Sequence, residues 1–542
     1  MSKSASFQEG LNKALPTFKM GVSLDPFNPK PQKKAGAVMP KKIIAHDLGT
    51  GGNKATLFDS DGGLIASVFA PYPTSTPGPN LIEQRPDDWL DAAAQSTRQL
   101  IRQTGTDPHD VAAMAISGHS LGTVPVDKDG NLLREETPIW SDRRAEAQAA
   151  AFFRKIDPTE WYLTTGNGFP AAHYSAFKIL WYKEHEPEMF RKTDMILGTK
   201  DYLNFRLTGV RATDPSYASG TGVYDLEKWD YSQKLLEASG LDPALFPKIL
   251  PSTEPLANLT REGAELMGLT PETVVCCGGV DNSCMALGAG SFKKGRVYTS
   301  LGSSSWIALC DSKPTLDVHA KSYVFTHVVP GLFTSALSIF SSGTTFRWIR
   351  DHFCRDLVAE AEKSGADIYD LMTAEAALSP PGARGLLNNP SLGGGTMLDA
   401  NPNMRGGFAN LDLSHTRADV IRATMEGIAM NMRAVMEALR KIAPTEKNLI
   451  AVGGGANSAL WRQIYADTLN MDLLRINIGQ NAASLGAAAL AFVGTGMWNS
   501  FDRLDDLLRP ESTTSPIPEN TEIYDAAYQK FRKFAGALGE LA

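Results

Sequence analysis

Residues 43–58 have the sequence IIAHDLGTGGNKATLF, in which two short apolar runs flank a glycine-rich segment. A third apolar run at 64–69 follows a second turn, DSDGG at 59–63. Runs of this length with glycines in the gaps are typical of an antiparallel β meander. The spacing of apolar residues over 86–104 predicts a helix after this meander, with Pro86 near its start.

The order of strand, glycine turn and strand returns later in the chain. An apolar strand at 274–277 leads to a Gly-Asp turn and a short helix, and a strand at 296–301 leads to GSSS at 302–305. A third turn, GGGAN at 453–457, follows the apolar run at 449–452. This pattern predicts an internally duplicated α/β fold with a cleft between two lobes.

Composition limits the possible functions. The 542 residues contain 53 Lys and Arg against 60 Asp and Glu, a formal charge of -7 that argues against nucleic acid as a partner. No apolar run approaches the ~20 residues of a membrane span. The five cysteines lack CxxC spacing, and residues 1–13 lack the apolar core of a secretory signal, so we expect a cytoplasmic protein with buried reduced thiols.

We expect four segments along the chain. Residues 1–40 are rich in proline and lysine and are predicted to be a flexible extension. An N-terminal domain is expected over 41–292, a C-terminal domain over 293–498 and a helical tail over 499–542.

The glycine turns indicate phosphate binding, because small residues leave backbone N–H groups accessible. The single-loop pattern G-x-x-x-x-G-K-[ST] is absent, which disfavours a P-loop enzyme. GHSLG at 118–122 matches the G-x-S-x-G nucleophile elbow, so a serine hydrolase using Ser120 is an alternative. That elbow requires a helix after the serine, whereas TVPVD at 123–127 looks like β structure.

In these segments the chain resembles the FGGY carbohydrate kinases, and among them most closely the xylulokinases. DLGTGGNK at 47–54, GVDN at 279–282, SLGSS at 300–304 and GGGANS at 453–458 are similar to the family's first phosphate loop, catalytic segment, second phosphate loop and adenosine-binding turn. Residues 175–185 and 406–426 fit its two signature patterns, except that His173, Tyr182 and Asn410 are atypical. The resemblance implies a duplicated actin-like, hexokinase-type (ribonuclease H-like) ATPase fold of two lobes.

The resemblance also implies a mechanism. Asp281 would be the base that takes a proton from a sugar hydroxyl, and its place at a helix N-terminus favours the carboxylate form. Asp47 would hold Mg²⁺. ATP would be bound by the following residues: Thr50, Gly51, Gly52, Lys54, Gly302 and Ser303 at the phosphates, and Gly454, Gly455 and Asn457 at the adenosine.

The expected substrate is a small ketose or polyol. The candidate substrate-binding residues are His119, Ser120, Trp140, Asp142, Asp281 and Asn282. Leu121 departs from the xylulokinase pattern and cannot bind a hydroxyl through its side chain, which bears on specificity. D-xylulose is the leading substrate, and the alternative substrates are another pentulose, a deoxyhexulose or a tetritol. An alternative function is a nucleotide-binding regulator without turnover. A homodimer is one assembly compatible with the sequence.

Overall fold

The computed structural model describes residues 42–396, 398–399, 401 and 403–542. The extension expected over 1–40 lies outside these residues. The described chain contains two large mixed β-sheets, each with seven strands. The first has the order β14-β15-β6-β1-β2-β3, with β16 pairing β6; the second has the order β19-β20-β18-β17-β23-β24-β25. Their strands are β1 (Lys42–Gly49), β2 (Gly52–Asp59), β3 (Leu64–Pro71), β6 (Val111–Gly118), β14 (Pro255–Asn258), β15 (Val274–Cys276), β16 (Gly279–Val280), β17 (Val297–Leu301), β18 (Ser305–Asp311), β19 (Tyr323–Thr326), β20 (Phe333–Ile339), β23 (Asn448–Val452), β24 (Asp472–Ile476) and β25 (Pro510–Thr514).

The two sheets repeat one topology, which confirms the predicted duplication. In each, an antiparallel meander (β1-β2-β3 or β17-β18-β20) is extended by parallel strands, β6 beside β1 and β23 beside β17. The second repeat begins at β17, however. The strand at 274–277 that the sequence grouped with the second half is β15 of the first sheet, because it pairs with β6.

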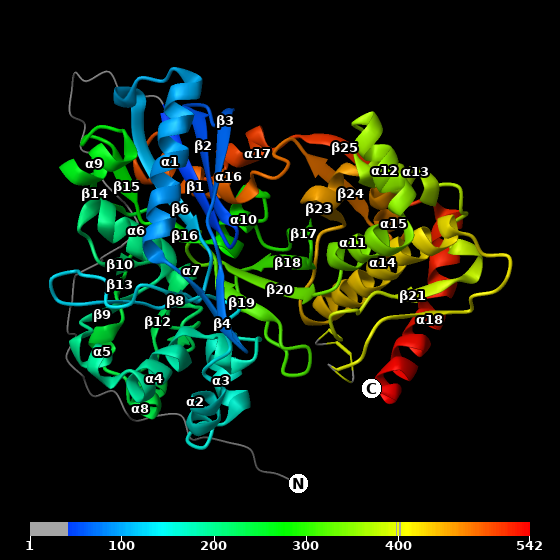
Figure 1. Cartoon of the computed structure of the whole chain (residues 1–542), viewed down its shortest axis with the longest axis horizontal. Coiled ribbons are helices and arrows are strands. Elements are labelled where there is room, and N and C mark those ends of the chain that lie inside the picture. Colours follow the sequence, from blue (N-terminus) through cyan, green and yellow to red (C-terminus); the bar gives the residue numbers. More distant parts are fainter. Residues whose placement is uncertain (1–41, 397, 400, 402) are drawn as a thin grey trace, which may run out of the picture. The chain divides into compact units, whose positions relative to one another are not determined.

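Helix α1 (Pro86–Thr104) has the predicted bounds and covers one face of the first sheet (Figure 1). Its buried Trp89 and Leu90 pack in the same core as Ile44 and Leu48 of β1. Side chains alternate along a strand, so Ile43, Ala45 and Asp47 lie on the opposite face of β1. The first two of these belong to the core that contains α16.

Helices α10 (Asp281–Gly288) and α16 (Ala482–Gly494) lie between the two sheets and contact the cores of both. They pack so closely that a Cβ on Gly288 would collide with the Ala482 carbonyl, and a Cβ on Gly486 with the Cys284 carbonyl. Small residues therefore permit this contact, as the composition AASLGAAALAFVG of α16 allows.

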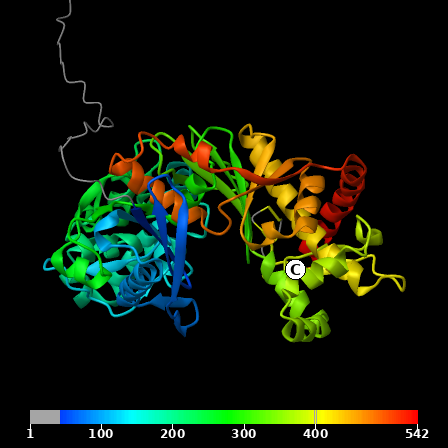
Figure 2. The same cartoon turned by 90° about the horizontal axis from the view of Figure 1, so that it is seen from above.

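The remaining elements surround this centre. Residues 499–542, expected to be a helical tail, form two helices and also the edge strand β25. Figure 2 shows α18 (red) beside the helices α14 and α15, which pack on the second sheet. The other helices are α2 (Glu146–Phe152), α3 (Pro158–Thr165), α4 (Ser175–His185), α5 (Pro187–Lys192), α6 (Thr199–Thr208), α7 (Pro215–Ala218), α8 (Gln233–Ser239), α9 (Arg261–Met267), α11 (Gly343–Phe353), α12 (Arg355–Ser364), α13 (Ile368–Ala376), α14 (Arg417–Ile442), α15 (Ala459–Leu469), α17 (Arg503–Leu507) and α18 (Pro518–Leu541). The short strands are β4 (Ser75–Gly78), β5 (Leu81–Gln84), β7 (Val124–Val126), β8 (Thr137–Pro138), β9 (Met195–Leu197), β10 (Ala212–Thr213), β11 (Tyr224–Asp225), β12 (Asp230–Tyr231), β13 (Lys248–Ile249), β21 (Leu387–Asn389) and β22 (Gly407–Ala409).

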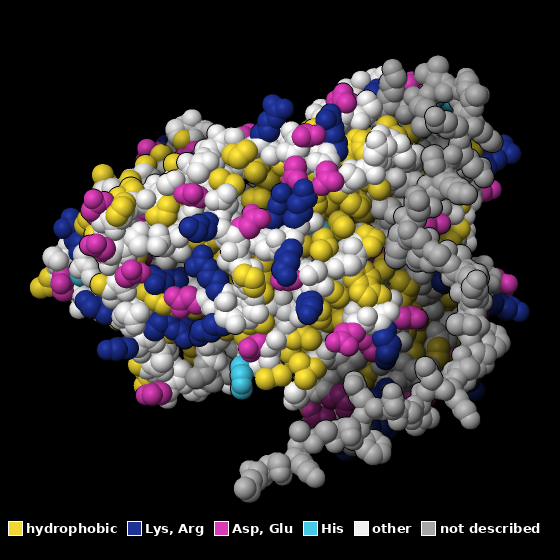
Figure 3. Space-filling model, turned by 180° about the vertical axis from the view of Figure 1, so that it is seen from behind, with side chains coloured by type: hydrophobic (Ala, Val, Ile, Leu, Met, Phe, Trp, Pro, Cys, Tyr) yellow, Lys and Arg dark blue, Asp and Glu magenta, His cyan; other side chains and the backbone are white. Residues whose placement is uncertain are grey.

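Two further sequence expectations can be compared with the structure. All five cysteines are buried and unpaired. Among the described residues, no helix is long and apolar enough to cross a bilayer. Figure 3 shows one face of the molecule, on which basic and acidic side chains are interspersed with hydrophobic ones.

Candidate active site

Asp281, the predicted base, and Asp47, the predicted metal ligand, lie at the carboxyl ends of two parallel strands that flank β6. In the parallel pairs β1–β6 and β6–β16, Ser117 is opposite both Asp47 and Gly279. Asp281 follows two residues after Gly279, as the first residue of α10. Strands lie roughly 5 Å apart, so the backbones at these ends are about 10 Å apart and the two side chains can meet. The charges of Asp47 and Asp281 do interact.

Asp281 is half-buried, and its Oδ1 accepts hydrogen bonds from the Asn282 backbone N–H (2.8 Å) and side-chain amide (3.1 Å). Loss of water contact raises the pKa of Asp281 from 3.8 to about 7, and the nearby Asp47 adds to the rise. The expectation that the helix N-terminus would favour the carboxylate is therefore wrong in its net effect. Desolvation and a like charge outweigh the helix dipole. A pKa near neutrality suits a general base.

The first glycine turn joins β1 to β2. Thr50 and Gly51 are exposed there, while Gly52 is buried against Phe69 and the Ala70 carbonyl, where a Cβ would collide. Lys54, predicted to add charge at the phosphates, forms an ion pair with Asp47 (3.2 Å) and donates to the Gln480 carbonyl (2.7 Å). It therefore links the first sheet to the loop before α16.

The second and third glycine turns line one cavity. Strands β17 and β23 are parallel with Ser300 opposite Val452, so the turns that follow them lie side by side. The cavity measures about 380 Å³, within the range of small-ligand sites. A Cβ on Gly454 would meet nothing within 4 Å, which leaves backbone accessible to a ligand. The predicted residues that line it are Gly302, Ser303, Gly454, Gly455 and Asn457.

Arg347 on α11 also lines this cavity, and the sequence motifs did not identify it. Its guanidinium donates to the Ser303 hydroxyl at 3.3 Å. Lys54 is paired with Asp47, whereas Arg347 brings a positive charge to the wall of the cavity that the two glycine turns share.

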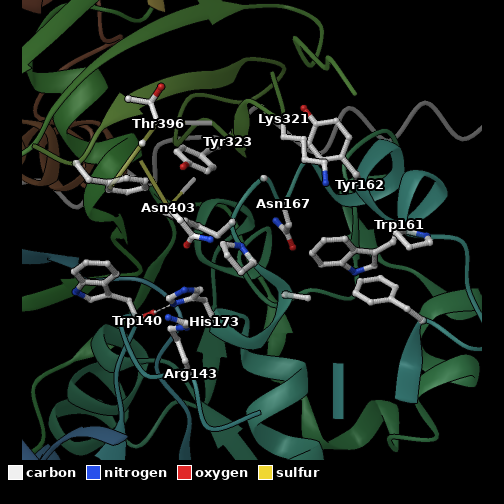
Figure 4. Close-up of a pocket in the computed structure, with 18 residues that line it drawn as sticks. Trp140, Arg143, Trp161, Tyr162, Asn167, His173, Lys321, Tyr323, Thr396 and Asn403 are labelled. Atoms are coloured by element: carbon white, nitrogen blue, oxygen red, sulfur yellow. Dashed lines mark hydrogen bonds between the residues drawn. The ribbon is translucent and has the colours of Figure 1, made fainter. Parts of the chain in front are cut away.

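A second cavity of about 610 Å³ contains Trp140 (Figure 4). Aromatic side chains form much of its wall: Phe169 stacks on Tyr323 with ring centroids 4.1 Å apart, and Phe340 lies nearby at 6.5 Å. Phe169 belongs to the first half of the chain. Tyr323 lies on β19 of the second sheet, and Phe340 directly follows β20 of the same sheet. The polar side chains of the lining are Arg143, Asn167, His173, Lys321, Thr396 and Asn403.

Trp140 and His173 are fixed by hydrogen bonds. The Trp140 indole N–H donates to the Thr50 hydroxyl (2.9 Å), joining this cavity to the first glycine turn. His173 Nδ1 lies 2.9 Å from the Trp140 carbonyl, shown by the dashed line in Figure 4. Burial lowers the pKa of His173 to about 4, so the ring is neutral near pH 7 and Nδ1 carries the proton. The other nitrogen, Nε2, is then an acceptor.

Of the six predicted substrate-binding residues, Trp140 lines the second cavity, whereas His119, Ser120, Asp142, Asp281 and Asn282 line neither. His119 is completely buried, with its ring edge-on to Trp89 at 5.3 Å. Asp142 is also completely buried, and its carboxylate is taken up by Arg144 (2.7 and 2.9 Å) and the Ile82 N–H (2.7 Å). Ser120, directly after His119, is half-buried. The complete burial of His119 and Asp142 speaks against the predicted contact of their side chains with a substrate.

The loop 118–122 is followed by strand β7 and contains no helical turn, which contradicts the nucleophile elbow. Instead, Leu121 has a φ of +63°, a strained conformation for a leucine. Its carbonyl accepts a hydrogen bond from buried Lys178 (3.1 Å), which also donates to the Ile139 carbonyl next to Trp140 (2.6 Å). Lys178 therefore fixes two loops of the site from one side chain.

Comparisons with known proteins agree with this architecture. Residues 42–288 match the N-terminal domain and residues 297–495 the C-terminal domain of the FGGY family of carbohydrate kinases. Xylulose kinase of Bacillus subtilis is 28% identical over 91% of this chain and 96% of its own length. Gluconokinase of the same organism is 30% identical over 90% and 94%. The crystal structure of xylulose kinase from Rhodospirillum rubrum superposes with a TM-score of 0.82 at 27% identity, over 92% of this chain and 99% of that one.

These matches span nearly all of the described chain and include both sheets with their glycine turns. The family acts on carbohydrates as phosphotransferases, which accords with a cavity lined by two glycine turns. The chain belongs to the FGGY family of carbohydrate kinases.

Proposed function

We propose that this kinase transfers the γ-phosphate of ATP to a hydroxyl group of a small ketose or polyol, with Asp281 as the base and D-xylulose as the leading substrate. The observation that carries the proposal is the placement of Asp47 and Asp281 at the carboxyl ends of two strands that flank β6, in a fold whose other sheet presents a glycine-lined cavity.

In the proposed reaction Asp281 accepts the hydroxyl proton while the hydroxyl oxygen attacks the γ-phosphorus and ADP leaves. The terminal phosphates would contact Thr50 and Gly51 on one side and Gly302 and Ser303 on the other. Adenosine would occupy the cavity beside Gly454, Gly455 and Asn457. Enclosure between the two halves of the chain would keep water from the phosphorus.

Mg²⁺ is the metal that fits this site. Asp47 offers a partly exposed carboxylate, the hard oxygen ligand that Mg²⁺ prefers, and Mg²⁺ commonly takes only one or two protein carboxylates besides phosphate and water. Among the described residues no group of three or more acidic, histidine or cysteine side chains forms a protein-only metal cage. When bound, Mg²⁺ would neutralise charge on the phosphates.

The sugar would lie in the aromatic cavity at Trp140 and His173. Curated relatives include xylulose kinases and gluconokinases, so the substrate set is a ketopentose, an aldonic acid, or the other pentuloses, deoxyhexuloses and tetritols of comparable size. Trp140 would cover the carbon chain, and neutral His173 would accept a hydrogen bond from a hydroxyl.

A coupled ADP-release assay with Mg²⁺ and ATP over ketoses, aldonic acids and polyols tests the proposal, with Asp281→Asn as the matched control. We expect saturable release with at least one acceptor and a loss of ~10²–10⁴-fold in the variant. ATP binding without acceptor-stimulated release across the panel would refute the kinase and favour a nucleotide-binding regulator.

A further inference from the structure

A completely buried charged cluster lies behind α10 and takes no part in the mechanism above. Lys200 of α6 has its ammonium 2.6 Å from Asp201 Oδ1 and 3.0 Å from Asp214 Oδ1, and all three side chains have at most 1% of their surface exposed. Buried ion pairs are costly to desolvate and add little net stability. Their retention here therefore calls for a specific role.

The cluster is connected to the catalytic segment through one hydroxyl. Asp214 Oδ2 accepts hydrogen bonds from the hydroxyls of Ser216 (2.5 Å) and Ser252 (2.8 Å). The Ser216 oxygen in turn accepts the backbone N–H of Val280 at 2.9 Å. Val280 caps α10 and is directly followed by Asp281.

Side chains around the same cluster also hold the backbone just before Val280, at residues 277–279, which we call the corner. The Cys277 carbonyl accepts from Lys200 (3.3 Å) and from Asn204 (2.8 Å). The Gly278 N–H donates to the Ser252 carbonyl at 3.0 Å. A Cβ on Gly279 would lie 3.2 Å from Ser216 Oγ, so the corner is packed directly on this hydroxyl.

We propose that Ser216, oriented by Asp214 and Lys200, is a positioning residue that sets the place of the Asp281 carboxylate through the Val280 N–H. The proposal rests on the role of Asp281 in the proposed function. A base contributes fully only when it is held within a fraction of an ångström of its working geometry. The nucleotide cavity is built from other strands, so loss of Ser216 is expected to affect turnover rather than ATP affinity.

Ser216→Ala and Ser252→Ala form a matched pair for the test. Both hydroxyls are buried and both donate to Asp214 Oδ2, but only Ser216 accepts from Val280. Each variant loses one hydrogen bond to the same carboxylate, so their melting temperatures serve as the measure of a merely structural effect. Hydrogen–deuterium exchange of peptides covering 277–288 then reports on the corner without requiring a substrate.

We expect faster exchange at 279–283 in Ser216→Ala than in Ser252→Ala, with melting temperatures that differ only by the loss of the one Val280 hydrogen bond. With the acceptor found in the panel, kcat should fall roughly tenfold or more in Ser216→Ala alone, with the KM for ATP unchanged. The acid limb of the pH profile should also move to lower pH, because a loosened Asp281 regains water contact. The ionisable groups facing Asp281 are Asp47, Cys284 and Tyr298, and neither substitution alters them.

Equal exchange and equal kcat in the two variants would overturn the positioning role. A fall in kcat that tracks melting temperature in both would overturn it as well. Full activity of Asp281→Asn would instead refute the proposed function, so the two failures are distinguishable.

Discussion

Asp281→Asn should inactivate the enzyme and at the same time stabilise it at alkaline pH. In the folded chain the pKa of Asp281 is raised from 3.8 to about 7. Above neutral pH Asp281 is ionised in both states, but its ionisation costs more free energy in the folded chain than in the unfolded chain. Asparagine removes this charge, and its side-chain oxygen can still accept the Asn282 N–H.

The size of the effect follows from the pKa difference. About three pKa units at 1.36 kcal/mol each give an upper limit of about 4 kcal/mol, and partial water contact reduces this to about 2 kcal/mol. The parent loses this stability as pH rises from about 3.8 to about 7, and the loss is constant above that. For a chain of this size we expect the melting temperature of the variant to exceed that of the parent by about 2 °C at pH 8. The difference should vanish near pH 4.

Thermal unfolding of both proteins from pH 4 to pH 9 checks the prediction, together with ADP release. Asp412→Asn is a control of opposite sign, because hydrogen bonds from Ser414 lower the pKa of Asp412 and its removal should reduce stability at neutral pH. In the parent, kcat/KM should fall tenfold per pH unit below about pH 7, where Asp281 is protonated. A variant less stable than the parent at pH 8, or a parent with full activity at pH 5, would refute the electrostatic argument.

Three further predictions concern the two cavities. Gly454→Val should raise the KM for ATP at least about tenfold without lowering the melting temperature, because the added side chain projects into open space in the nucleotide cavity. Arg347→Gln should raise the KM for ATP about fivefold, equivalent to about 1 kcal/mol for one exposed charge, and an unchanged KM would exclude contact with phosphate. His173→Phe keeps the ring near Phe169 but removes the acceptor nitrogen, so the KM for the sugar should rise about five- to tenfold while that for ATP stays constant; steady-state kinetics with each substrate varied in turn separates these cases.

The sequence predicted features that local patterns determine. Helix 86–104 was predicted with its full bounds, because helical spacing and the N-terminal proline act within a few residues. The glycine turns were located correctly, and the pairing of Gly302 with Gly454 in one cavity follows from the parallel register of β17 and β23. The predicted second repeat begins one strand too early. The composition of the strand at 274–276 does not indicate which sheet it joins, and in the structure it pairs with β6 of the first sheet.

The sequence did not reveal the environment of side chains whose hydrogen-bond partners are brought to them by the fold. Asp142 resembled a sugar-binding acid, but Arg144 and the Ile82 N–H occupy both of its oxygens. His173 was noticed only as atypical in a signature, and its hydrogen bond to Trp140 depends on a contact across 33 residues. Arg347 lies in no motif, since its proximity to Ser303 arises only when α11 packs beside β17.

The position of Asp281 brings these points together. Its helix, α10, is in contact with α16 and with the cores of both sheets, and glycines at that contact leave no room for adjustment. Any movement of one sheet relative to the other must therefore act on α10, whose first residue is the proposed base. The buried Lys200–Asp214–Ser216 chain holds the backbone N–H of Val280, the residue directly before Asp281. Asp281 is thus tied to the first half of the chain through Ser216 and to the second sheet through the core that α10 shares with it, so the place of its carboxylate depends on both halves.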